Sequence, residues 1–126
     1  MNLAPIVLFV YNRPEHTLQV LQAIEQSPLA AQSELYVFAD GPKNGANAEE
    51  LAKIYQTRQL IRCKTWCKKT YLTELEQNKG LANAIIDGVT QIVEQHQKVI
   101  VIEDDIVIAP YFLTFMNKAL TLYEKE

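Results

Sequence analysis

The sequence has little cysteine, which removes one class of site at the outset. It holds two cysteines, Cys63 and Cys67, in the stretch Cys-Lys-Thr-Trp-Cys. A zinc site would need two further ligands, and His16 and His96 are far away along the chain. We therefore expect two reduced, partly buried thiols of the kind found in intracellular proteins.

Excess positive charge and long apolar runs are also missing. Twelve Lys and Arg stand against fifteen Asp and Glu, which gives a net charge of −3. A nucleic-acid-binding domain usually carries a basic footprint, so we expect no nucleic-acid partner. The apolar run at 6–10 is too short for a signal peptide and far below the roughly 20 residues of a membrane helix. We therefore expect a soluble, cytoplasmic chain.

Five of the twelve cations lie in one short stretch, between Arg58 and Lys69. In an acidic chain such a stretch is most simply a solvated helix face followed by a strand edge. The alternative is a weak peripheral contact with the inner face of a membrane.

Several familiar motifs are absent as well. The chain has no G-x-x-x-x-G-K-[ST], no G-x-G-x-x-G after its first apolar run and no G-x-S-x-G. A P-loop, a dinucleotide-binding fingerprint and a serine hydrolase elbow are thereby excluded. Asn12-Arg13 follows the first apolar run, where a phospho-receiver or a haloacid-type phosphatase would show an acid.

The sequence does contain a regular alternation of strand and helix patterns. Short apolar runs rich in β-branched and aromatic residues predict strands at 5–11, 34–39, 69–75 and 98–102. Apolar residues at helical spacing predict helices at 14–26, 48–62, 81–93 and 110–123. This order predicts one α/β domain over residues 1–126. We expect a three-layer α/β/α sandwich with a mainly parallel, Rossmann-like sheet in the strand order 3-2-1-4. The polar third strand should lie at an edge, and the fourth should be buried on both faces.

Polar residues follow each predicted strand at its end. These groups are Tyr11-Asn12-Arg13, Asp40-Gly41, Asn78-Lys79-Gly80 and Glu103-Asp104-Asp105. The carboxyl ends of parallel strands share one rim, and ligands bind in open α/β sheets at that rim. We therefore expect one site there, although each group alone could be an ordinary solvated turn.

The type of each residue suggests nucleotide recognition with a metal. Three consecutive acids repel one another, and a hard cation such as Mg²⁺ or Mn²⁺ is the simplest relief. Asp40 could accept a hydrogen bond from a base N–H, and Gly41 would let the backbone approach closely. Lys79-Gly80 stands at a helix start, where free N–H groups favour anions.

In this order the motifs resemble the nucleotide-binding half of GT-A-fold glycosyltransferases. The stretches that carry the resemblance are 7–14, 38–41, 78–84 and 101–105, and it extends from about residue 4 to 123. It is nearest to the family 2-like inverting enzymes and to the N-acetylglucosaminyltransferase I type. The latter also carries Glu-Asp-Asp as its form of the D-x-D motif.

The resemblance implies a role for each motif residue. The base and ribose pocket would be lined by Tyr11, Asn12 and Arg13. The base edge would be read by Asp40, beside Gly41. The ribose-diphosphate would be faced by Lys79, Gly80 and Asn83. The ribose or sugar would be contacted by Glu103 and Asp104, and Asp105 would bind Mn²⁺ or Mg²⁺.

The implied activity is transfer of a sugar from a nucleotide-diphosphate sugar, with UDP favoured by the resemblance, to a saccharide or glycolipid acceptor. The resemblance also implies that the acceptor site and the catalytic base belong to a C-terminal half beyond residue 126. We therefore expect these residues alone to be inactive.

Two alternatives remain. A non-catalytic remnant of the same fold could bind a nucleotide or a partner. It would expose an apolar patch, with Phe112, Phe115 and Met116 as candidates, and could self-associate through that face. A nucleotidyltransferase would need a Gly-rich basic loop after the first strand, and the sequence at 12–15 provides none.

Overall fold

The computed structural model describes residues 2–124 and contains the predicted alternation of strands and helices. The strands are β1 (Ile6–Val10), β2 (Glu34–Ala39), β3 (Lys69–Glu74) and β4 (Ile100–Glu103). The helices are α1 (Pro14–Glu25), α2 (Ala48–Arg62), α3 (Leu81–His96) and α4 (Phe112–Glu124). A short 3₁₀ turn, η1 (Ala30–Gln32), was not predicted.

The sheet confirms the predicted fold class. Its four strands are all parallel and lie in the order β3-β2-β1-β4. β1 is central, because Ile6 is in register with Leu35 of β2 on one side and with Ile100 of β4 on the other. All five β1 side chains are buried, as a strand covered on both faces requires.

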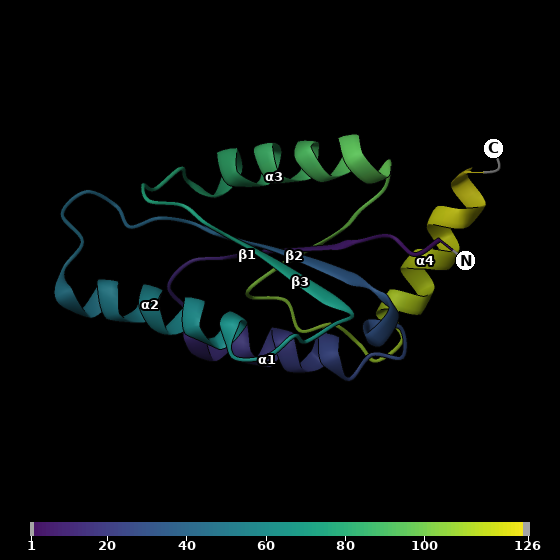
Figure 1. The fold of residues 1–126 in the computed structure, drawn as a ribbon, viewed down its shortest axis with the longest axis horizontal. Coiled ribbons are helices and arrows are strands. Elements are labelled where there is room, and N and C mark those ends of the chain that lie inside the picture. The colour runs from purple at the N-terminus through teal and green to yellow at the C-terminus, as the bar shows by residue number, and fades with distance from the viewer. Residues whose placement is uncertain (1, 125–126) are drawn as a thin grey trace.

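Helices cover both faces of the sheet (Figure 1). α1 and α2 lie below it in that view, and α3 lies above it. Alternate residues of β1 therefore serve different cores. Leu8 belongs to the larger core on the α1 side, whereas Val7 and Phe9 pack in the smaller core with Ile92 of α3.

Local sequence signals set the starts of two helices. Pro14 is the first residue of α1, where its missing N–H costs nothing. Asn47 precedes α2, and its Oδ1 accepts the Glu50 N–H at 2.9 Å, which is the hydrogen bond of a helix N-cap.

One burial prediction is wrong. β4 lies at the edge of the sheet, as the predicted strand order 3-2-1-4 requires, but it was also expected to be buried on both faces, and Val101 is 39% exposed. β4 pairs with β1 alone, and α3 packs over β1 and β2 rather than over β4. The apolar run therefore did not show that one face of this edge strand is partly exposed. The prediction that β3 lies at the other edge is confirmed.

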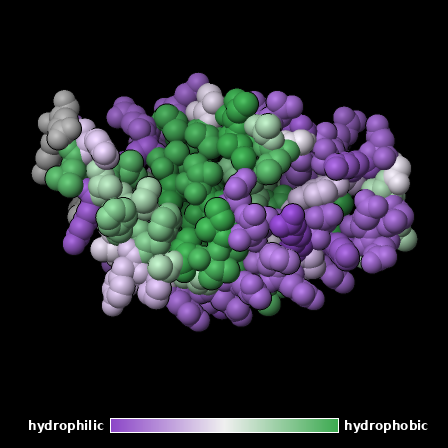
Figure 2. Space-filling view, turned by 180° about the vertical axis from the view of Figure 1, so that it is seen from behind, coloured by the Kyte–Doolittle hydropathy of each residue, from purple (hydrophilic) through white to green (hydrophobic). Residues whose placement is uncertain are grey.

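Apolar side chains gather on one exposed face (Figure 2). Exposed large apolar residues come from α3, from β4 and the segment after it, and from α4: Ile86, Val93, Val101, Ile106, Val107, Phe115 and Leu122. Of the three α4 residues predicted for such a patch, Phe115 is exposed, while Phe112 and Met116 are partly buried against the core. No helix within residues 2–124 is long and apolar enough to cross a membrane.

α4 docks through one buried polar side chain. Asn117 Oδ1 accepts the Ala4 N–H at 2.7 Å, and Asn117 Nδ2 donates to the Leu113 carbonyl at 2.8 Å. Since Ala4 leads into β1, this contact places α4 beside the amino ends of the strands. An ion pair between Lys98 Nζ, just before β4, and Glu124 Oε1, at the end of α4, at 3.1 Å also joins α4 to the amino ends of the strands.

We predict that Asn117→Ala lowers the free energy of unfolding by about 1–3 kcal/mol, because it leaves the buried Ala4 N–H without a partner. Urea unfolding followed by circular dichroism measures the change. The matched control is Lys118→Ala, which is exposed and should change stability by less than about 0.5 kcal/mol. Equal effects of the two substitutions would contradict this account of α4 docking.

Candidate functional site

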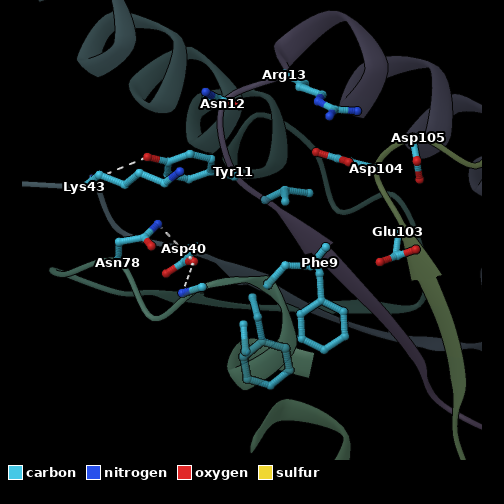
Figure 3. A pocket seen from close by; sticks show the side chains of 15 residues that line it. Phe9, Tyr11, Asn12, Arg13, Asp40, Lys43, Asn78, Glu103, Asp104 and Asp105 are labelled. Atoms are coloured by element: carbon cyan, nitrogen blue, oxygen red, sulfur yellow. Dashed lines mark hydrogen bonds between the residues drawn. The ribbon is translucent and has the colours of Figure 1, made fainter. Parts of the chain in front are cut away.

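A pocket of about 280 Å³ lies at the carboxyl ends of β1, β2 and β4 and the start of α3 (Figure 3). The motif residues that line it are Tyr11, Asn12, Arg13, Asp40, Gly80, Glu103, Asp104 and Asp105. Its other lining residues are Phe9, Val10, Phe38, Lys43, Asn78, Leu81 and Ala84. Residues from four separate stretches of the chain therefore meet in one place.

The topology explains where the pocket forms. The chain passes from β1 to β2 and β3 on one side, and then returns to place β4 on the other side of β1. The connections leaving β1 and β4 diverge at such a switch point, which opens a crevice beyond the strand ends. The residues after β1 line the middle of this crevice, with Asp40 on one side and Glu103 on the other (Figure 3).

Asp40 is the most highly connected side chain of the site, and it is buried. Its Oδ1 accepts the backbone N–H groups of Gly41 and Lys79, both at 2.8 Å. Its Oδ2 accepts the Gly80 N–H at 3.1 Å and Asn78 Nδ2 at 3.2 Å. A carboxylate offers about four acceptor positions, so all of them are taken within the fold. Asp40 thereby ties the end of β2 to the turn before α3.

Two further contacts fix this junction. Arg58 Nη2 on α2 donates to the Asp40 carbonyl at 3.0 Å and to the Leu75 carbonyl at 2.8 Å, which joins the ends of β2 and β3. Gly41 packs against the backbone of Gln77, where an added Cβ would lie 2.5–2.6 Å from three backbone atoms. Only glycine permits the two segments to approach this closely.

The opposite wall carries the acidic triplet. Asp104 is half-buried, whereas Asp105 is exposed at the rim. Burial raises the pKa of Asp104, and Asp105 and Glu103 raise it further, while Arg13 and His16 act in the opposite direction. Figure 3 shows the Arg13 guanidinium turned toward Asp104 across the pocket. The net shift shows that these cations do not fully offset the cost of holding a charge there.

The donor atoms of the triplet suit a divalent cation that is shared with a ligand. In residues 2–124, no three His, Cys, Asp or Glu side chains converge into a cluster that could enclose a metal. Mg²⁺, however, is commonly held by one or two carboxylates together with substrate phosphates and water. Asp104 and Asp105 at the pocket rim fit that mode.

Three of the predicted site residues do not line the pocket. Gly41 is buried behind Asp40. The Lys79 ammonium pairs with Asp87 at 2.8 Å on α3, so Lys79 contributes its backbone N–H to the junction. Asn83 is exposed on α3, and its Nδ2 lies 3.3 Å from the Lys79 carbonyl.

The sequence reading also missed several lining residues. Phe9 and Phe38 stack with ring centroids 5.5 Å apart and form an apolar floor. Their positions near the ends of two buried strands could have indicated this. Lys43 lines the pocket from the loop after β2, and its backbone N–H donates to Tyr11 Oη at 3.3 Å. Asn78 was expected at this rim as part of the polar turn after β3, but no role in the site was assigned to it.

The two cysteines lie away from the pocket. Both are free thiols, with Cys63 exposed and Cys67 buried. Burial, aided by Glu25, raises the pKa of Cys67 to about 12, so this side chain is a neutral thiol at pH 7.

Comparison with known proteins adds no family assignment. No protein-family model and no curated protein matches the chain.

We predict that Asp40→Ala lowers the free energy of unfolding of the ligand-free protein by about 2–4 kcal/mol, because buried donors lose a charged acceptor. Denaturant unfolding measures the loss. Asp87→Ala is the control, since its pair with Lys79 is exposed and worth about 0–1 kcal/mol. A loss at Asp40 no larger than that at Asp87 would show that the carboxylate does not hold the turn.

A second prediction concerns pH. Asp104→Asn should raise the free energy of unfolding at pH 7, because the folded state of the parent disfavours the ionised carboxylate. Because the pKa of Asp104 is raised on folding, the parent protein has its full stability only below the unfolded-state pKa of about 3.9, where the carboxyl group is protonated in both states. The parent loses stability as the pH rises through the folded-state pKa. The advantage of Asn should therefore shrink on acidification toward about pH 4.

Urea unfolding over a pH series, without added divalent cations, tests this prediction. The control is Asp87→Asn, an exposed carboxylate on α3. An advantage of Asp104→Asn that grows on acidification would refute the sign of the effect.

Proposed function

We propose that the chain is the donor-binding part of a metal-dependent glycosyltransferase. It would bind a nucleotide-diphosphate sugar, most simply a UDP-sugar, for transfer to a saccharide or glycolipid acceptor. The observation that carries the proposal is the convergence of Asn12-Arg13 after β1 with Glu103-Asp104-Asp105 after β4 on one pocket at the switch point of the sheet. The resemblance of the motifs to the donor half of GT-A enzymes supports the same assignment.

The charge balance of the pocket supports a metal-linked diphosphate. Its lining holds two cationic side chains, Arg13 and Lys43, against four carboxylates. A bare diphosphate would meet net repulsion there. Asp104 and Asp105 would hold a divalent cation at the rim, and that cation would supply the positive charge that a diphosphate needs there.

In this proposal, different side chains of the pocket contact different parts of the nucleotide sugar. The apolar floor of Phe9 and Phe38 would pack against the nucleoside, and Tyr11 and Asn12 would flank it. Asp105 and Asp104 would hold the cation at the rim. Arg13, which faces Asp104, would supply fixed positive charge near the diphosphate, where preorganised charge lowers the barrier most.

A second candidate is a non-catalytic module that binds a nucleotide or a partner. The observation that favours it is that β4 is an edge strand of the sheet and carries an exposed apolar side chain, Val101. An uncovered edge strand with apolar neighbours is a common site of association. Gel filtration at several concentrations tests it, and a monomer at every concentration would argue against this candidate.

We predict that UDP and Mn²⁺ together raise the thermal unfolding temperature by more than the sum of their separate effects. A ligand that binds only the folded state adds RT ln(1 + [L]/Kd), which is about 2.7 kcal/mol at a hundredfold excess over Kd. Asp105→Ala should remove the excess shift, because it removes an exposed carboxylate from the cation.

Glu94→Ala, an exposed carboxylate on α3 outside the pocket, serves as the control and should keep the excess shift. Additive shifts in the parent would reject a shared metal-diphosphate site. If the excess shift persists in Asp105→Ala, the shared site stands and only the role of Asp105 is rejected.

A further inference from the structure

The wall of the pocket around Asp40 has few acceptors that remain open to a ligand. The carboxylate already accepts four hydrogen bonds from the chain itself. The Asp40 carbonyl accepts from Arg58, and the Gly41 carbonyl accepts from Asn78 Nδ2 at 3.0 Å. A base that presents an N–H to this wall therefore needs an acceptor other than the Asp40 carboxylate.

Asn78 provides one. Its Nδ2 donates to both Asp40 Oδ2 and the Gly41 carbonyl, at 3.2 and 3.0 Å. The reversed amide would place Oδ1 against these same two acceptors, so the orientation is fixed by the surrounding oxygens. Asn78 lines the pocket, and within residues 2–124 no group donates a hydrogen bond to its Oδ1, which is also not a buried atom. Figure 3 shows the amide beside the Asp40 carboxylate.

We propose that Asn78 Oδ1 is the acceptor that recognises the nucleobase, and that Asp40 is a positioning residue that holds Asn78 and the following turn in place. This inference rests on the proposed nucleotide site and assigns its base specificity. The favoured bases present a ring N–H on their pairing edge, as uracil and guanine do. Cytosine presents a ring-nitrogen lone pair at the equivalent position, which would face the lone pairs of Oδ1.

The test compares Kd values for UDP and CDP, measured by calorimetric titration in saturating Mg²⁺. One hydrogen bond gained by UDP, against a lone-pair contact for CDP, should favour UDP by about tenfold in the parent. In Asn78→Ala this preference should fall to about twofold or less. The same substitution frees one acceptor position of Asp40, so a base read directly by Asp40 would keep its preference for UDP, and the two assignments predict opposite results.

Asn44→Ala is the matched control, because Asn44 lies in the neighbouring loop, is exposed and does not line the pocket. It should keep the parent ratio. Asn78→Ser provides a second variant with the same expected loss, in case Asn78→Ala does not fold by circular dichroism.

The outcomes separate the two proposals. If the parent binds neither UDP nor CDP, the nucleotide site itself is wrong. If the parent binds UDP but shows no preference over CDP, or if a folded Asn78 variant keeps the preference, the nucleotide site stands and Asn78 is not the reader. Binding of GDP as tight as that of UDP would support a ring N–H as the recognised feature.

Discussion

The arrangement of the site depends on the hydrogen bonds that the Asp40 carboxylate accepts. Four N–H donors converge on it, and three of them come from the turn that precedes α3. β2 and α3 are joined there although they are separated by α2 and β3 along the chain. The contact fixes where α3 begins, and α3 supplies Leu81 and Ala84 to the pocket. A buried charge is tolerated at this position because it is fully hydrogen-bonded.

The central position of β1 is the second constraint. Because β1 has a neighbour on each side, the residues that follow it reach both walls of the pocket, and Tyr11 and Arg13 lie between them. The parallel arrangement sends every strand end to the same rim, whereas α4 lies by the amino ends through Asn117 and Ala4. The fold thus separates the pocket from the α4 contact at opposite ends of the sheet.

Much of this was readable from the sequence, and the failures have physical causes. Periodicity gave the strands, the helices and their order, because each element must bury one face or both. The strand-end groups were correctly expected on one rim. Periodicity could not reveal that one face of β4 is partly exposed, because burial of that face depends on whether a helix packs over it rather than on the residues of the strand. It also could not show that the Lys79 side chain turns to Asp87, since a side-chain direction is set by tertiary contacts. Asn78 was read as part of a turn because its amide acquires a role only when Asp40 lies beside it.

The two acidic walls of the pocket differ in how far the fold itself satisfies their carboxylates. This difference distinguishes a carboxylate that holds the structure together from carboxylates that are available to a ligand. Asp40 faces four N–H donors supplied by the fold, so its charge is satisfied without any ligand. Within residues 2–124, Asp104 and Asp105 have no comparable set of donors, and burial is the main cause of the raised pKa of Asp104. Removing a satisfied buried carboxylate should harm the fold, whereas neutralising an unsatisfied one should help it. The fold disfavours the ionised form of Asp104, which is the property expected of a carboxylate in a cation-dependent binding site. It is therefore at the β4 wall, and not at the more fully hydrogen-bonded Asp40, that we propose an external cation binds.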